Sequence, residues 1–265
     1  MIIHDQHVHS KYSMDSNQEL EPYIKKALEV GCKYFVTTEH FDFDLVEHHI
    51  NWTVDYSNLK KEFEKLHHKY PNIVLLLGME LGYRKDHLDD MNAQLAKEQY
   101  DLVNLSIHDN EYADFYWEKY FIKYGVDYLM NVYFDEMIEA TSTFFNYDVL
   151  SHIDYGFKTI YMLDKNYKIS KYEDKIKEVM KNLIQNHKAL EINTKVQEAI
   201  HNDEHTRYLL ELYRSLGGQR LTLSSDAHSV ERYQSSFEYY KNMIKECGFD
   251  YLVYFVKRKE YIYYL

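Results

Sequence analysis

Short β-rich runs alternate with amphipathic stretches along the whole chain, and this alternation constrains the fold more than any other feature of the sequence. We expect strands at residues 2–6, 33–38, 73–78, 101–106, 147–151, 188–193 and 220–224. The segments between them are long enough for the helical crossovers that join parallel strands. The sequence therefore predicts an α/β fold, a single domain over residues 1–265 in which seven βα units form a closed or nearly closed barrel. Residues 251–256 are expected either as an eighth strand or as a packed tail.

The first helical segment illustrates how the elements are recognised. Ser16 and Glu19 match a capping box, and apolar side chains then recur at helical spacing from Leu20 to Leu28. Gly31 follows as a stop signal. The next run, residues 34–38, is aromatic and β-branched, which is typical of a buried strand.

Composition excludes several classes of protein. No apolar stretch approaches the roughly 20 residues of a membrane-spanning helix, and the N-terminus lacks a signal-peptide pattern, so we expect a cytoplasmic protein without membrane contact. The 31 basic and 43 acidic side chains leave a net charge of −12, which argues against long nucleic acid as a partner. Cys32 and Cys247 are not spaced as a thiolate metal site and are expected to be packing residues.

Polar side chains follow six of the seven predicted strands. Ligand sites of barrels and open α/β sheets lie at the carboxyl ends of the strands, so these side chains are expected to share one site. They are Asp5, His7, His9, Glu39, His40, Glu80, His108, His152, Asp154, Asp226 and His228. A His-x-His pair on a strand places both imidazoles on one face, and the Asp-x-His pair at 226–228 does the same. Nitrogen and carboxylate ligands without cysteine suit Zn, Mn or Fe and predict a metal cluster.

Other histidines among the 15 are interpreted differently. His48, His49, His67 and His68 stand in polar, helix-like surroundings and are expected to be solvated surface residues. An isolated histidine such as His108 would by itself indicate nothing about metal. The recurrence of these residue types at successive strand ends is what favours the metal interpretation.

The motifs resemble those of the polymerase and histidinol phosphatase (PHP) superfamily. Its six elements occur here in order and span nearly the whole chain: His7-Val8-His9, Thr38-Glu39-His40, Gly78-Met79-Glu80, Ser106-Ile107-His108, His152-Ile153-Asp154 and Ser225-Asp226-Ala227-His228. Within the superfamily, the chain is similar to the stand-alone histidinol-phosphate phosphatases. Phe41-Asp42 after the second motif, Tyr155 after the fifth and Leu190 to Thr194 support that narrower resemblance.

The resemblance implies a distorted (β/α)7 TIM-like barrel that holds two or three divalent ions, Zn, Mn or Fe, at the carboxyl ends of its strands. It implies three ligand sets: His7, His9, Glu80 and Asp226 for one ion, Glu80, His108 and His152 for a second, and Asp15, His40 and His228 for a third. The segment around Asp15 also fits a turn and cap. Relatives often carry a basic pair after the fifth motif, whereas this chain has Phe157-Lys158, so that Lys158 replaces a possible phosphate-binding arginine. Lys158 is either a phosphate contact or an ordinary surface lysine. A lysine supplies charge without the bidentate fork of arginine.

Metal chemistry of this kind predicts hydrolysis of a phosphate ester by a hydroxide that bridges the ions. The general acid stays open between Asp42, Asp154 and a metal-bound water, and Asp154 could instead orient a liganding imidazole. The resemblance implies the substrate L-histidinol phosphate and a role in histidine biosynthesis. Two alternatives are a nucleotide or oligonucleotide phosphoesterase of the same superfamily, and a metal-binding regulatory module without turnover.

Overall fold

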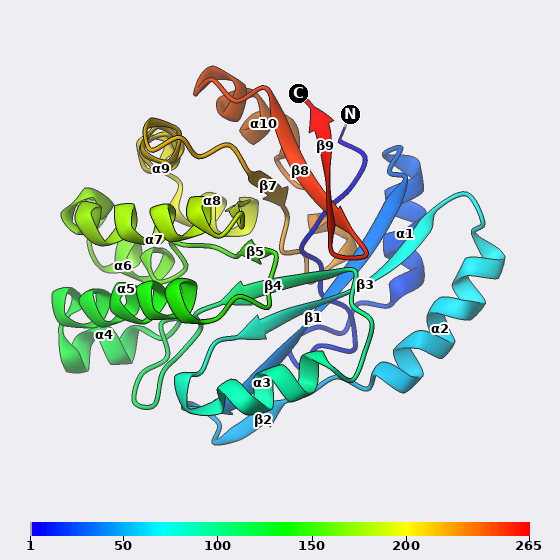
Figure 1. Cartoon of the computed structure of the whole chain (residues 1–265), viewed down its shortest axis with the longest axis horizontal. Helices are drawn as coiled ribbons and strands as arrows, with labels where there is room; N and C mark the ends of the chain where they lie inside the picture. The colour runs from blue at the N-terminus through cyan, green and yellow to red at the C-terminus, as the bar shows by residue number, and fades with distance from the viewer. Residues whose placement is uncertain (1) are drawn as a thin grey trace.

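The computed structural model describes residues 2–265, and a curved, mainly parallel sheet lies at its centre (Figure 1). Its strands lie in the order β2-β1-β3-β4-β5-β6-β7. Their bounds are β1 (Tyr34–Leu45), β2 (Ile50–Trp52), β3 (Val74–Gly82), β4 (Leu102–Ser106), β5 (Val149–Leu150), β6 (Ala189–Asn193) and β7 (Leu221–Ser224). Every neighbouring pair from β1 through β7 is parallel, and β2 is antiparallel to β1. The predicted α/β fold with a parallel sheet is confirmed.

Helices cover the outside of the sheet (Figure 1). They are α1 (Leu20–Glu29), α2 (Tyr56–Lys69), α3 (Leu88–Leu95), α4 (Glu118–Tyr124), α5 (Val126–Thr143), α6 (Phe157–Leu163), α7 (Glu173–Gln185), α8 (Thr194–Ile200), α9 (Asp203–Ser215) and α10 (Phe237–Glu246). Three short 3-10 helices are η1 (Lys85–His87), η2 (Ile169–Tyr172) and η3 (Val230–Arg232). Within residues 2–265, every helix is too short or too polar to cross a membrane.

The strand expected at residues 2–6 is wrong, because this segment forms no regular ladder. Side chains satisfy its backbone instead: Asn104 Nδ2 donates to the carbonyl of Gln6 at 3.0 Å, and Gln234 Nε2 donates to that of His4 at 2.8 Å. Further along, Val8 forms an isolated parallel bridge with Ala227, and its carbonyl accepts a bond from the Thr38 amide at 2.8 Å. The segment therefore lies between β1 and the residues that follow β7.

The predicted ends of two strands also need correction. β1 and β3 were expected to end at residues 38 and 78, yet they pair in parallel up to Phe41 and Leu81. Backbone pairing continues beyond the apolar runs, so the polar residues His40 and Glu80 lie inside the strands and not after them. The capping box is wrong as well, since α1 begins at Leu20 and its N-cap Glu19 makes no side-chain cap bond. The glycine stop is confirmed by Gly31, whose φ is +78°.

The C-terminal segment is not an eighth strand of the sheet but packs against it, as the second expectation had it, in the form of a hairpin. β8 (Tyr251–Val256) pairs with β9 (Lys259–Tyr264) in an antiparallel hairpin. Val253 and Phe255 of β8 pack against residues near the start of five strands: Val36, Leu76, Leu102, Val149 and Ala189. The hairpin thereby closes the amino end of the sheet and leaves the carboxyl end open.

The same hairpin buries His4. Its ring stacks on Tyr254 with 4.7 Å between centroids, and neither ring nitrogen has a hydrogen-bond partner among residues 2–265. Burial lowers the pKa of His4 from 6.5 to about 3, so the folded protein holds this imidazole neutral. The unfolded chain takes up a proton below about pH 6.5 and the folded chain does not, so stability falls as the pH drops from 6.5 toward 3.

We therefore expect His4→Phe to reduce acid sensitivity. Between pH 7 and pH 5, the wild type should lose about 2 kcal/mol more unfolding free energy than the variant. Urea unfolding of both metal-loaded proteins at the two pH values measures this difference. His67→Phe, at an exposed histidine of α2, is the control and should follow the wild type. Parallel losses in the wild type and His4→Phe would contradict the prediction.

Candidate metal centre

Five imidazoles converge on the buried carboxylate of Glu80 at the carboxyl end of the sheet. Glu80 Oε2 lies 3.1 Å from His7 Nε2, 3.3 Å from His9 Nε2 and 2.9 Å from His40 Nδ1. The other oxygen, Oε1, lies 3.2 Å from His108 Nε2 and 2.8 Å from His152 Nε2. Ser106 Oγ also donates to Oε1, at 2.5 Å. The centre is thus built around one carboxylate of β3.

Parallel register explains this convergence. His40 of β1 and Glu80 of β3 are direct neighbours across the pair, so their side chains leave the same face of the sheet. His108 lies two residues beyond the end of β4, and His152 lies two residues beyond the end of β5. Neighbouring parallel strands end at the same edge, which brings these residues together.

Three of the imidazoles share one orientation. The Nδ1 atom of each lies near a buried side chain: Glu191 Oε1 at 2.7 Å for His7, Ser13 Oγ at 3.1 Å for His9 and Asp42 Oδ1 at 2.8 Å for His108. In each case the opposite nitrogen, Nε2, faces Glu80. Partners of this kind fix the ring orientation and tautomer of metal-binding histidines.

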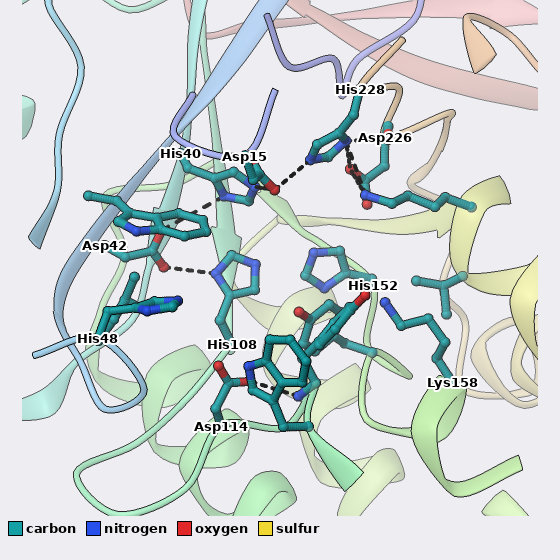
Figure 2. A pocket seen from close by; sticks show the side chains of 17 residues that line it. Asp15, His40, Asp42, His48, His108, Asp114, His152, Lys158, Asp226 and His228 are labelled. Atoms are coloured by element: carbon teal, nitrogen blue, oxygen red, sulfur yellow. Dashed lines mark hydrogen bonds and ion pairs between the residues drawn. The ribbon is translucent and has the colours of Figure 1, made fainter. Parts of the chain in front are cut away.

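Asp15, Asp226 and His228 lie on one side of the centre (Figure 2). His228 Nε2 is 2.9 Å from Asp15 Oδ2, and His40 Nε2 is 3.5 Å from the same oxygen. Asp226 Oδ1 lies 3.4 Å from His9 Nε2. All nine residues that the sequence suggested as ligands therefore lie in one connected cluster.

The donor atoms fit a metal cluster. The inward atoms His7 Nε2, His9 Nε2, His40 Nδ1 and Glu80 Oε2 are buried, and despite their short separations they are not aligned for a hydrogen bond with any atom of residues 2–265. Among residues 2–265, four groups of three have ligand atoms within 4.8 Å of one another: His9, His40 and His228; His7, His9 and Asp226; His7, Glu80 and His152; His40, Glu80 and His108. Asp15 is in none of these groups, and His108 and His152 are in different ones. Buried nitrogen and oxygen atoms of this kind suit Zn, Mn or Fe.

The pKa shifts describe a site that needs compensating charge. Burial alone would raise the pKa of Glu80, but the charges of His7, His40 and His108 bring it well below its ordinary value. Burial lowers the pKa of His9, and the neighbouring His40 and His228 lower it further. The imidazoles are too close together for all of them to carry protons at once.

Two backbone features support the site. His152 and Asp226 have φ angles of +22° and +48°, in a region that non-glycine residues rarely adopt. Such strain persists only where surrounding contacts hold it in place, often at functional sites. Gly82 allows a close approach, because a Cβ atom there would lie 2.0 Å from Asp42 Oδ1. A larger residue would displace the carboxylate that orients His108.

The cluster opens into a cavity of about 530 Å³. Figure 2 shows the labelled histidines and carboxylates that line it, with Lys158 beside His152. Lys158 Nζ lies 4.0 Å from the centroid of the Tyr116 ring. Burial lowers the pKa of Lys158 to about 8, and the neighbouring charge of Lys195 acts in the same direction. The lysine is therefore part of the cavity wall.

Comparison with known proteins agrees with this geometry. A family model described as the PHP domain matches residues 5–195, which is more than half of the chain. The chain belongs to the PHP family.

Curated relatives that match this PHP protein are named histidinol-phosphatases. It is 25% identical over 252 residues to the histidinol-phosphatase of Lactococcus lactis, which covers 92% of this chain and 91% of the relative. It is 26% identical over 261 residues to a probable histidinol-phosphatase of Clostridium acetobutylicum, which covers 97% and 98%. The crystal structure of the Lactococcus lactis histidinol phosphate phosphatase, complexed with zinc, L-histidinol and phosphate, matches with a TM-score of 0.88. That match has 24% identity and covers 97% of this chain and 98% of the other.

Several residues of this PHP centre were missed by the sequence reasoning. Lys195, two residues after β6, places Nζ 3.2 Å from Asp226 Oδ1 and lines the cavity. Glu191 within β6 lies against His7 and also accepts a bond from the His152 amide at 2.8 Å. Both residues lie near the carboxyl end of the strand predicted at 188–193, and that position could have indicated that they belong to the site. His48 was expected to be only a surface residue, but it also lines the cavity, because it lies in the turn between β1 and β2 and not in a helix.

Asp154 lies elsewhere. Its Oδ2 atom is 2.8 Å from His205 Nε2 and accepts a bond from Gln197 Nε2 at 2.6 Å. Neither partner is a suggested ligand, and Asp154 does not line the cavity. This placement favours neither the general-acid role nor the role of orienting a liganding imidazole. Asp42, by contrast, lines the cavity and contacts His108.

Proposed function

We propose that this PHP protein is a metal-dependent phosphate monoester hydrolase that converts L-histidinol phosphate to L-histidinol and phosphate. The observation that carries the proposal is the convergence of five imidazoles on Glu80 beneath a cavity that two lysines also line. The names of the relatives support the choice of substrate. A cavity of about 530 Å³ suits a small ester better than a polymer.

The ligand assignment is part of the proposal. We propose that His7, His9, Glu80, His108, His152, Asp226, His40, His228 and Asp15 together hold two or three divalent ions, Zn, Mn or Fe. When bound, such ions neutralise phosphate oxygens and lower the pKa of water enough to supply a nucleophile near neutral pH.

The side chains around the ligands orient the imidazoles and attract the phosphate. Glu191, Ser13 and Asp42 each lie against the Nδ1 atom of one imidazole and leave its Nε2 atom directed inward. We assign Lys158 and Lys195 to the phosphate, because both carry positive charge into the cavity beside the ligand cluster. As point charges they attract the phosphate without fixing its orientation as two arginine forks would. Asp42 acts here as a positioning residue, and no general acid is assigned.

A kinetic screen tests the proposal. Metal-reconstituted protein should hydrolyse L-histidinol phosphate with a kcat/KM at least about 100-fold above that for a nucleoside monophosphate or a short oligonucleotide. Preference for either nucleotide would favour a nucleotide phosphoesterase instead. Bound metal without hydrolysis of any ester, including 4-nitrophenyl phosphate, would indicate a regulatory module.

A further inference from the structure

One carboxylate in the cavity wall makes no ion pair with a lysine, arginine or histidine of residues 2–265. Four aspartates line the cavity, and three of them, Asp15, Asp42 and Asp226, lie 2.8 to 3.2 Å from a histidine or lysine nitrogen. Asp114 is the exception: within residues 2–265 its hydrogen-bond partner is the Tyr116 amide, which donates to Oδ1 at 2.8 Å. The Oδ2 atom of Asp114 is left for a ligand.

The loop that carries Asp114 is held in place by its own hydrogen bonds. Asp109 and Asp114 form an antiparallel bridge, and the Phe115 amide donates to the His108 carbonyl at 2.9 Å. Thr159 Oγ1 of α6 donates to the Tyr116 carbonyl at 2.7 Å. The carboxylate is therefore positioned before a ligand arrives, which lowers the cost of binding.

Charge around Asp114 favours a cationic ligand. Burial raises its pKa to about 6. The hydrogen bond from the Tyr116 amide and the positive charge of His108 oppose this shift, and the negative charges of Glu47 and Asp42 add to it. A cation beside the carboxylate would relieve both penalties. Asp114 lies on the His108 side of the cavity, whereas Lys158 lies on the His152 side (Figure 2). The two ends of a bound ester would thus meet opposite charges.

Aromatic side chains flank this carboxylate. Tyr116 and Trp117 follow it in the loop, are 44% and 43% exposed, and line the cavity with Trp52. One face of Tyr116 is already taken by Lys158 Nζ. The exposed ring of Trp117 is available to a flat ring or a cation.

We propose that Asp114 and Trp117 form the subsite for the alcohol part of the substrate, in which Asp114 selects phosphate monoesters whose alcohol carries an ammonium group. This inference rests on the proposed function and names the residue that recognises the positive charge of the substrate. The same carboxylate repels the phosphate group, so the ester enters with its phosphate toward the lysines and the ligand cluster.

The test compares two substrates that differ in one amino group. They are L-histidinol phosphate and 3-(imidazol-4-yl)propyl phosphate, in which hydrogen replaces that group. Asp114→Asn keeps the acceptor for the Tyr116 amide and removes the charge. It should lower kcat/KM for L-histidinol phosphate by about 10- to 100-fold, mainly through KM, and change kcat/KM for the analogue by less than about twofold. Inhibition by L-histidinol should weaken in parallel, whereas inhibition by inorganic phosphate should not.

A matched control is Glu111→Gln, which removes an exposed carboxylate from the same loop and should leave the kinetic constants unchanged. An equal loss on both substrates in Asp114→Asn, or no loss on either, overturns the inference. Wild-type protein that hydrolyses 4-nitrophenyl phosphate but not L-histidinol phosphate contradicts the proposed substrate instead. In that event phosphoethanolamine and ethyl phosphate are used as the two substrates. A loss of kcat/KM in Asp114→Asn for phosphoethanolamine alone then supports the role of Asp114.

Discussion

Replacement of Glu80 with glutamine is expected to lower kcat/KM for L-histidinol phosphate by at least about 1000-fold, more than the roughly 10- to 100-fold typical of groups that only orient a ligand. Glu80 is fully buried, and its two oxygens contact the imidazoles of five histidines. An amide has the same shape, but it carries no charge and directs N–H donors where metal ligands need lone pairs. The variant should therefore also bind at least one ion fewer.

Steady-state kinetics and metal analysis of the same preparation measure both effects. Glu98→Gln is the matched control, because this half-buried glutamate lies outside the cavity, pairs only with Lys60 among residues 2–265 and should leave turnover unchanged. Circular dichroism should show the same secondary structure in all three proteins. Wild-type metal content and turnover in Glu80→Gln would exclude Glu80 from the metal centre.

Removal of the metal ions is expected to lower Tm by about 10 °C or more. A ligand at 100 to 1000 times its Kd contributes about 3 to 4 kcal/mol of stability, and each kcal/mol shifts Tm by about 2 to 4 °C in a protein of this size. Without cations, the imidazole rings of His9 and His40, with centroids 4.1 Å apart, and of His9 and His228, 4.4 Å apart, remain crowded in a buried site. Calorimetry of metal-loaded and chelator-treated protein measures the shift.

Two further observations make this result specific. Adding Zn, Mn or Fe back should restore both Tm and activity, and the Glu80→Gln variant should show a smaller shift because it binds fewer ions. An unchanged Tm after metal analysis has verified removal would contradict a centre that is coupled to folding.

Much of the fold could be predicted because local patterns report which face of a segment is buried. The runs at 101–106, 188–193 and 220–224 agree with β4, β6 and β7 within a residue at each end. Pairing between distant segments leaves no such pattern. The N-terminal segment is held by side chains such as Asn104, and the hairpin of β8 and β9 closes the amino end of the sheet instead of joining it.

The candidate site was likewise predicted only in part. The motifs and the family resemblance pointed to nine ligand candidates, and eight of them lie in the compact groups of three. The residues that hold those ligands were not predicted, because Glu191 contacts His7 across 184 positions of sequence. Asp114 also escaped notice, since nothing local distinguishes an unpaired carboxylate from a solvated one.

By itself, the sequence determined the alternation of strands and helices and the residue types at the strand ends, because the period of side-chain burial and the chemistry of histidine and carboxylate are local properties. Tertiary structure alone decided which nitrogen of each imidazole faces inward, which aspartate of the cavity stays outside the close ion pairs and which segment closes the amino end. Those outcomes depend on distances between residues far apart in the chain, and such distances exist only once the chain has folded.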